Sequence, residues 1–426
     1  MQPINPAAAS PTSSLVKRAI AAHAALGTAI SAVLYIICLS GTIAVFKDEL
    51  HGWEQSGEPR LISLTPAAAF TAAKQALAHE PSSEHLIIQL PAPGTPWATA
   101  RTDHHEFYIK DDGSLSLEAN RPWSDFIVEL HYYLHLPKKA GLIVVSIFGV
   151  MLFALSISGF IAHPKIFQEA FSFRRSKSEQ LKQTDLHNRL SVWTAPFHLS
   201  NSLTGAVIGL AGISAVVIGQ LNHNGNHEQV FEAIYGPKPA HNSNQAELAR
   251  IDKALEHMLN NFPERPMTHI LLHDPGTEGQ YLQIMAEHSR RLIYAEKYNY
   301  DNQGGFTGTT GSADGYLGQQ IADSVYKVHF GNYGGLPVKL AYGLFGCCLL
   351  LIITAGMKIY FLKRQARGRA VPELEAAWRA VVWGSPLMLL VTFGVSTLGG
   401  VTTSTLVTVF WVGILLIVLL KMTRHR

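Results

Sequence analysis

The chain alternates between long apolar runs and polar segments. Each apolar run is long enough to cross a bilayer as a helix, which takes about 20 residues. The first run continues to Phe46 without a small-residue cleavage site. Because secretory leaders carry only about 7–15 apolar residues, we expect an anchored helix there. The pattern predicts about six transmembrane helices, at 22–46, 140–162, 196–220, 338–361, 378–399 and 401–420.

The composition also indicates a membrane protein. Hydrophobic residues make up 47% of the chain and charged residues 15%, whereas soluble domains carry about 25% charged residues. The net charge of +3 is too small to indicate a nucleic-acid partner, and no basic run is interleaved with aromatic residues. The cysteines form no zinc, iron–sulfur or covalent haem motif. All of them fall in apolar runs: Cys38, Cys347 and Cys348.

Basic residues in the short loops predict how the helices are oriented. They cluster before the first helix, between the second and third, after the fourth, and at the end of the chain. Loops rich in Lys and Arg stay in the cytoplasm, so both termini are expected there. The polar segments 47–137 and 221–337 are then expected outside. The residues that carry this signal are Lys17, Arg18, Arg174, Arg175, Lys177, Lys182, Arg189, Lys363, Arg364, Arg367, Arg369, Lys421, Arg424, His425 and Arg426.

The two outer segments share one plan. Residues 65–80 and 246–262 have the periodicity of helices, and each is followed by short strand-like runs. Each segment is therefore expected to form a small α+β module. The glycine-rich stretch 304–315 lacks the context of a nucleotide-binding loop and is interpreted as a mobile outer loop, or alternatively as a cover over a substrate. The expected strand-like runs are 85–90, 96–101, 106–117 (with a turn at Asp112-Gly113), 268–274, 280–287 and 290–298.

The helices that flank these modules repeat as well. His23 lies eighteen residues before Gly41, and His187 lies eighteen residues before Gly205. The unit of helix, outer module and helix thus occurs twice, and the interface of such a repeat is a common place for a membrane site. The last two predicted helices contain no histidine and are interpreted as structural. After the modules come the matching pairs Leu130-His131 and Val328-His329.

Seven histidines near the ends of predicted helices are the candidate functional residues. A neutral imidazole nitrogen is a common ligand of metals and of haem iron. A haem held between two helices takes two such histidines at one depth. The alternative is that they are interfacial histidines that only form hydrogen bonds with the backbone or with lipid headgroups. The candidates are His23, His163, His187 and His198 on the cytoplasmic side, and His131, His135 and His329 on the outer side.

On the outer side the repeat pairs His131 with His329. His135 follows His131 by four residues, so the two would share one face of a continuous helix. The choice between them as the ligand stays open at this stage.

On the cytoplasmic side two pairings are possible for His23. The repeat favours His187, whereas depth favours His198, because His187 would lie roughly 16 Å further along one continuous helix. The eleven residues that separate His187 from His198 correspond to about three turns, which again gives one face.

Four stretches of the sequence together resemble the PepSY-associated transmembrane helix family, over roughly residues 15–365. The outer modules are similar to PepSY domains. The family includes iron-regulated inner-membrane proteins and a siderophore reductase that acts on ferrioxamine. The resembling stretches are ELHYYLHLPKKAG, SISGFIAHPKIFQEAFSFRR, DLHNRLSVWTAPFHLSNSLTG and VHFGNYGGLPVKLAYGLFG.

The resemblance implies a bacterial inner-membrane protein with four core helices, non-covalent b-type haem and PepSY-like periplasmic modules. It makes His23, His131, His187 and His329 the first ligand candidates, and His135, His163 and His198 a second tier. The chain departs from the family by its two C-terminal helices. The expected fold class is a membrane all-α bundle of about six helices, with a four-helix haem-binding core and two small α+β modules.

The expected function is that of a reductase with two bis-histidine haems. Electrons from a separate donor, a quinol or a reductase, would cross the membrane and reduce an Fe(III)-siderophore or another ferric chelate outside it. Two alternatives remain: a non-enzymatic PepSY-type binding or regulatory protein anchored in the membrane, and a transporter of haem or siderophore. The expected organisation is 1–46 (N-terminus and first helix), 47–137 (first module), 138–220 (second and third helices), 221–337 (second module), 338–362 (fourth helix) and 363–426 (cytoplasmic loop and two further helices).

Overall fold

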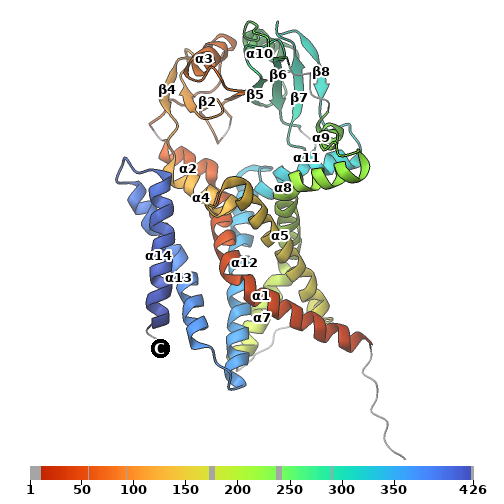
Figure 1. Ribbon diagram of the computed structural model, residues 1–426, viewed down its shortest axis with the longest axis vertical. Coiled ribbons are helices and arrows are strands. Elements are labelled where there is room, and N and C mark those ends of the chain that lie inside the picture. Colours follow the sequence, from red (N-terminus) through yellow and green to blue (C-terminus); the bar gives the residue numbers. More distant parts are fainter. Residues whose placement is uncertain are drawn as a thin grey trace, which may run out of the picture. The chain divides into compact units, whose positions relative to one another are not determined.

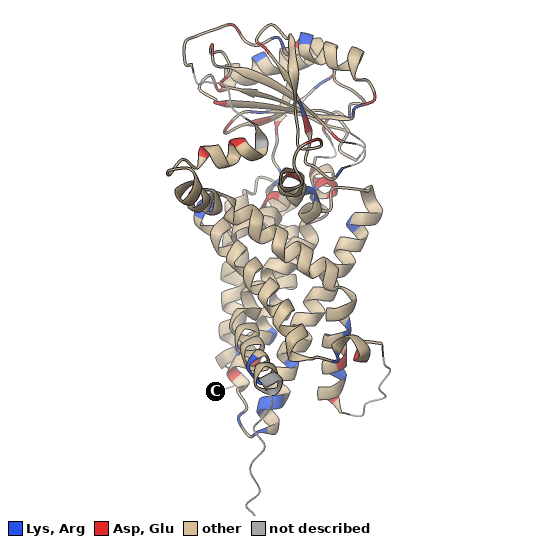
Figure 2. Ribbon diagram, turned by 90° about the vertical axis from the view of Figure 1, so that its right-hand side faces the viewer, with Lys and Arg blue, Asp and Glu red and all other residues tan. Residues whose placement is uncertain are grey.

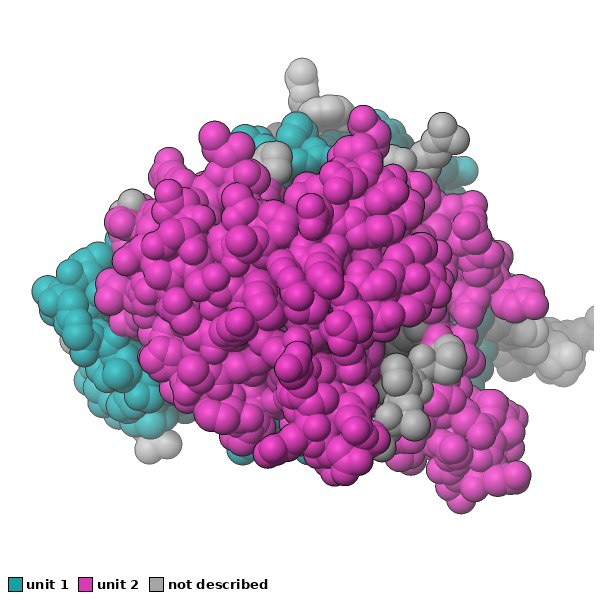
Figure 3. Space-filling view, turned by 90° about the horizontal axis from the view of Figure 1, so that it is seen from above, with its two compact units in different colours: residues 1–45, 122–210, 334–426 teal, residues 46–121, 211–333 magenta. Residues whose placement is uncertain are grey.

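The computed structural model describes residues 11–55, 57–92, 94–171, 178–236, 242–288 and 291–423. The chain divides into two compact units, which are coloured teal and magenta in Figure 3. Unit 1 comprises residues 1–45, 122–210 and 334–426, and unit 2 comprises 46–121 and 211–333. Part of the orientation signal lies outside the described residues: Arg174, Arg175, Lys177, Arg424, His425 and Arg426.

Six described helices are long and apolar enough to span a membrane, as the sequence predicted. Charged side chains are scarce along them; Figure 2 shows most of their length in tan. Lys363 and Arg364 lie in the last turn of the fourth long helix, and Lys421 lies in that of the last. The six are α1 (Pro11–Ala44), α5 (Lys138–Ala162), α8 (Ala195–Asn222), α12 (Gly335–Ala366), α13 (Pro372–Ser396) and α14 (Thr403–Thr423).

Three of the long helices are preceded by a separate short helix that carries a candidate histidine. These are α4 (Pro122–Tyr133) with His131, α7 (Glu179–Trp193) with His187, and α11 (Leu317–Phe330) with His329. We expected each histidine to enter the long helix itself, and that expectation is wrong. Shorter helices elsewhere are α2 (Lys47–Glu54), α6 (Ile166–Glu169) and α9 (Glu228–Tyr235).

The breaks between short and long helices have local causes. After α4, Leu134 and His135 adopt positive φ angles of 54° and 57°, and Pro137 caps α5. After α11, Gly331 is left-handed with φ 67°, which glycine adopts without steric cost. The expected common face of His131 and His135 therefore does not exist, because His135 lies beyond the end of α4.

Unit 2 contains one antiparallel sheet of eight strands in the order β4-β3-β2-β1-β5-β6-β7-β8. The two outer segments were expected to form separate modules, but β1 of the first pairs with β5 of the second, with His85 opposite His273. The strands are β1 (His85–Gln89), β2 (Ala98–Arg101), β3 (Glu106–Ile109), β4 (Leu115–Glu118), β5 (Met267–His273), β6 (Tyr281–Ala286), β7 (Glu296–Tyr300) and β8 (Phe306–Thr310).

One face of this sheet is covered by the two predicted helices, α3 (Pro66–His79) and α10 (Ile251–Asn261), as Figure 1 shows. Thr65 caps α3 by accepting a hydrogen bond from the Ala68 N–H, which satisfies one of the free donors at a helix start. The fully buried alanines of α3 let the helix lie close to the strands. The core on this face includes Ala69, Ala72, Ala73, Ala76, Leu86, Ile88, Leu255, Met258, Ile270 and Ile284.

Two expectations for the second outer segment need correction. Residues 304–315 are not one loop, because Phe306–Thr310 forms the edge strand β8. Phe and Thr favour the extended backbone, and Gly308, with φ 136°, lies beside an irregularity in the pairing with β7. The strand expected at 290–298 begins only at Glu296.

Candidate functional site

Two candidate histidines from distant parts of the chain lie next to each other in unit 1. The ring centres of His23 on α1 and His187 on α7 are 6.2 Å apart, and the ring planes are nearly perpendicular at 82°. His187 rather than His198 is thus the neighbour of His23. The depth argument for His198 assumed one continuous helix, whereas α7 is a separate helix that packs against α12.

Each of these two rings is anchored by Nδ1 to a backbone carbonyl of a neighbouring long helix. His23 Nδ1 lies 3.1 Å from the Leu155 oxygen on α5, and His187 Nδ1 lies 2.9 Å from the Ile352 oxygen on α12. Because a carbonyl oxygen only accepts, Nδ1 carries the proton in the neutral ring. The lone pair is then on Nε2, which is the atom that binds a metal when the other nitrogen is held in this way.

A glycine lies against each ring, four residues after the carbonyl that holds it. A Cβ added at Gly159 would lie 3.4 Å from Cε1 of His23, and one added at Gly356 would lie 3.2 Å from Cε1 of His187. In an α-helix the carbonyl of residue i already accepts the N–H of residue i+4. A glycine at i+4 leaves the side of that carbonyl open to the imidazole.

His131 on α4 repeats this arrangement on α1. Its Nδ1 lies 2.9 Å from the Ile37 oxygen, and Gly41 follows Ile37 by four residues. A Cβ at Gly41 would lie 2.6 Å from Cε1 of His131. Three of the four first-tier histidines are therefore held by the same combination of carbonyl and glycine on a neighbouring helix.

His135 is placed differently, and both of its ring nitrogens form hydrogen bonds within the protein. Trp411 on α14 donates its indole N–H to Nδ1 at 3.2 Å. Nε2 lies 2.9 Å from the Phe126 oxygen and donates to it. Both ring nitrogens of His135 are thus engaged in hydrogen bonds within the protein, so His131 stays the first candidate ligand on this side.

The other second-tier histidines lie apart from the anchored pair. His198 on α8 is buried; its ring nitrogens lie 3.2–3.3 Å from Thr194 Oγ1, and its Nε2 lies 3.5 Å from the Phe345 oxygen. His163 follows the last residue of α5 and is exposed. His329 belongs to unit 2, whereas His131 belongs to unit 1, so their pairing stays a prediction.

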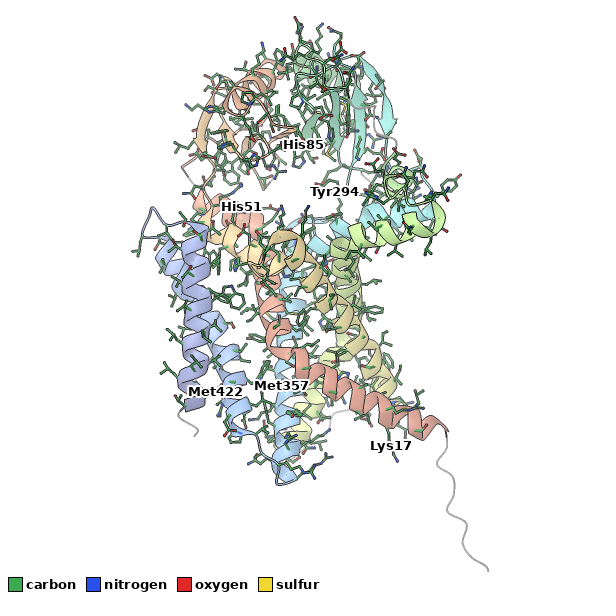
Figure 4. The ribbon with its side chains drawn as sticks, viewed as in Figure 1. Lys17, His51, His85, Tyr294, Met357 and Met422 are labelled. Atoms are coloured by element: carbon green, nitrogen blue, oxygen red, sulfur yellow. The ribbon has the colours of Figure 1, made fainter. Side chains whose placement is uncertain are left out.

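Within unit 2 a row of aromatic rings leads away from His329. The ring centres of His329 and Phe330 are 5.6 Å apart, those of Phe330 and Tyr326 are 6.1 Å apart, and those of Tyr326 and Tyr294 are 6.0 Å apart. Tyr294, labelled in Figure 4, lies in the segment before β7. The sequence analysis missed Tyr294 and Tyr326, because only the fold brings that segment beside α11.

The face of the sheet opposite α3 and α10 carries both apolar and charged residues, among them Ile87, Leu271, Arg101 and, opposite Arg101, Glu106. Side chains alternate along β1 and β5, so that Leu86, Ile88 and Ile270 face the core while His269 faces the other way. Burial, together with the nearby charges of Arg101 and Lys47, lowers the pKa of His269 to about 4. Arg101 also acts on Tyr294, whose pKa is raised by burial. The aromatic row thus ends near Arg101 of β2.

The anchored pair has the donor set and spacing of a bis-histidine haem site. An iron atom bonded at about 2 Å to one nitrogen of each ring, the usual metal–imidazole distance, separates the ring centres by about 6 Å. The observed 6.2 Å agrees with this. His23 lies on α1, which is apolar enough to span a membrane, and the polar helix α7 that carries His187 packs against α12, which is another such helix.

Comparison with known proteins places this chain in a family. The model of the PepSY-associated TM region matches residues 20–364, which is most of the chain and includes all seven candidate histidines. The chain belongs to the PepSY-associated transmembrane family. It is also 25% identical over 297 residues to the uncharacterized protein PA4219 of Pseudomonas aeruginosa, covering 63% of this chain and 72% of that protein.

Proposed function

We propose that this protein is a haem-containing reductase of the bacterial inner membrane that passes electrons outward to a ferric chelate. The observation that carries the proposal is the His23–His187 pair, with ring centres 6.2 Å apart. Each ring holds its Nδ1 proton on a carbonyl. Both Nε2 atoms are then available as neutral ligands, as haem iron requires.

Haem bound at this pair would supply reversible one-electron transfer. Groups of the protein would set the properties of the two ligands and of the space around the haem. The Leu155 and Ile352 carbonyls hold the tautomer of the two imidazoles and raise their basicity as ligands. Gly159 and Gly356 leave room beside the rings. The apolar helices keep water away, which favours tuning of the potential by burial and hydrogen bonds.

A second haem follows from the repeat. His131 has the same kind of anchor as the inner pair, in the Ile37 carbonyl and Gly41. Its counterpart in the sequence repeat is His329. We propose these two histidines as the ligands of an outer haem. Two haems on opposite sides of the membrane provide a route for electrons across it.

The acceptor is proposed to bind outside the membrane, at the end of the aromatic row on unit 2. Tyr294 lies near Arg101 there, and Arg101 and Lys47 both lie near His269 of the same unit. The acceptor proposed for this place is an Fe(III)-siderophore or another ferric chelate. Each electron reduces one Fe³⁺ to Fe²⁺, which binds hard oxygen ligands less strongly and is released.

The electron donor is proposed to be a separate molecule on the cytoplasmic side, a quinol or a reductase. A quinol loses two electrons and two protons on becoming a quinone, so one quinol suffices for two ferric ions. Both termini are proposed to be cytoplasmic, in accord with the positive residues that end α12 and α14.

An absorption spectrum of the detergent-purified protein tests the proposal. We expect a Soret band and, after dithionite, sharp α and β bands, with two haems per chain. Addition of Fe(III)-ferrioxamine to the reduced protein should reoxidise the haems and release Fe²⁺ to a ferrous chelator. A colourless protein from haem-supplied cells would contradict the proposal and favour a binding or regulatory protein. Haem that ferric chelates do not reoxidise, with transport of the chelate into vesicles, would favour a transporter.

A further inference from the structure

The two C-terminal helices, which lie outside the repeat, contact α4, the short helix that carries His131. The indole N–H of Trp411 on α14 bonds to Nδ1 of His135, at 3.2 Å. Nε2 of the same ring bonds to the Phe126 oxygen of α4, at 2.9 Å. An indole nitrogen only donates and a carbonyl only accepts, so a single neutral tautomer of His135 satisfies both bonds. His135 therefore connects α14 with α4.

The backbone at this connection is strained. Leu134 and His135 both adopt the left-handed conformation, with φ 54° and 57°, which is sterically unfavourable for residues other than glycine. Such residues persist where the surrounding structure determines them. Here the His135 ring holds the conformation. It forms two hydrogen bonds and stacks on Phe126, with 4.8 Å between the ring centres.

A second set of contacts holds the other end of α4. Trp123 donates its indole N–H to Oγ1 of Thr392 on α13, at 3.2 Å, and its ring lies 5.0 Å from that of Phe393. Phe126 packs edge-to-face on Phe410 of α14 at 5.6 Å. Thr392, Phe126 and Phe410 are all fully buried. The first turns of α4 are thus fixed to α13 and α14 before the chain reaches His131.

We propose that α13 and α14 hold α4 in the orientation that directs His131, and that Trp411 and His135 are positioning residues for the outer haem ligand. His131 precedes His135 by four residues, so a rotation of α4 that relieves the strain at His135 also moves the His131 ring. The bond between His131 and the Ile37 carbonyl would then be lost. This inference rests on the proposed function for the role of His131 as a ligand.

The variant Trp411→Phe tests it, because it removes the donor and keeps an aromatic ring. We expect the midpoint potential of one haem to shift while that of the other stays. Hydrogen exchange of residues 122–133 should become several-fold faster in the full chain, with or without haem. The control is Trp383→Phe on α13, since Trp383 is 75% exposed; it should change neither quantity.

Unchanged potentials and unchanged exchange in Trp411→Phe would overturn the inference and leave the proposed function intact. If Trp411→Phe does not fold, Thr392→Val replaces it, since this variant removes the acceptor of Trp123 at similar volume. In Thr392→Val, a shifted midpoint potential of one haem and faster exchange of residues 122–133 support the inference. Wild-type values of both quantities overturn it. A wild-type protein without haem would contradict the proposed function and with it the ligand role of His131. If the wild type contains no haem, faster exchange of residues 122–133 in the variant than in the wild type would still show that the C-terminal helices hold α4.

Discussion

Gly41 of α1 lies directly against the imidazole of His131: a Cβ added at residue 41 would lie 2.6 Å from Cε1 of that ring. The same ring bonds by Nδ1 to the Ile37 carbonyl, one helical turn earlier on α1. The imidazole thus occupies the space that a side chain at residue 41 would fill. His131 fits there because residue 41 is glycine and has no Cβ.

We therefore expect Gly41→Ala to lose the outer haem. The added methyl group cannot coexist with the ring at 2.6 Å, so His131 must turn away and release the Ile37 carbonyl. Haem per chain, measured as the pyridine haemochrome, should fall from two to about one. The control is Gly394→Ala on α13, where a Cβ would meet nothing within 4 Å. Two haems in Gly41→Ala would contradict the placement of His131.

The three glycines should differ in the severity of their alanine variants. The distance from the added Cβ to Cε1 rises from 2.6 Å at Gly41 to 3.2 Å at Gly356 and 3.4 Å at Gly159. Alanine is close to an ordinary contact at Gly159 but requires the ring to shift at Gly356. Haem retention should follow this order, with Gly159→Ala nearest to wild type. An equal loss in all three variants would indicate a general packing effect instead.

Replacing single histidines tests whether His187 or His198 is a ligand of the inner haem. His187→Ala should remove one haem per chain, because it takes away one side of the pair with His23. His198→Ala should retain both haems, although His198 is also buried. Loss of a haem in His198→Ala, with normal content in His187→Ala, would reverse the assignment.

The stability of the sheet unit should fall in mild acid through His269. Burial lowers its pKa to about 4 in the folded protein, against about 6.5 in the unfolded chain. Between these values the unfolded state binds more protons, so stability is full above about pH 6.5 and is lost as the pH falls. The loss by pH 5 is at most roughly 2 kcal/mol.

His269→Gln should reduce this acid dependence, because glutamine does not titrate. The measurement is the Tm of the full chain in detergent at pH 7 and pH 5. A matched control is His227→Gln, at an exposed histidine of the same unit. If the two variants and the parent lose the same amount of Tm between these pH values, His269 does not contribute.

The aromatic row predicts a residue needed for reduction of the external acceptor. Tyr294→Leu removes the last ring, which lies 6.0 Å from Tyr326. We expect slower reoxidation of the haems by Fe(III)-ferrioxamine, with haem content and spectrum unchanged. Tyr294→Phe keeps the ring and should retain the rate. Equal rates in the two variants would exclude this route.

The sequence predicted the six long helices well, because a bilayer demands about 20 apolar residues in a row, and such runs are visible without any tertiary information. It also predicted α3 and most of the strands from their periodicity. It did not predict that β1 would pair with β5, since either segment alone has the pattern of a small module. It interpreted β8 as part of a loop, because the surrounding stretch 304–315 is rich in glycine, which is uncommon in strands.

The candidate histidines could be ranked from the sequence only as far as the repeat allowed. The repeat matches His23 with His187 and His131 with His329. The structure anchors His23, His131 and His187 in the same way. The choices that stayed open, His187 or His198 and His131 or His135, depended on whether a helix continues. Whether a helix continues depends on capping residues and on positive φ angles at single residues. The pattern of apolar residues does not predict either of these.

The sequence by itself thus determined the number of long helices, the histidine repeat and the family. The tertiary structure decided which residues touch: His187 with His23, Gly41 with His131, and Trp411 with His135. The physical reason is that hydrophobicity is a property of local composition, whereas each of these contacts joins residues more than 80 positions apart. Such contacts depend on helix ends, packing angles and single hydrogen bonds, which exist only once the chain has folded.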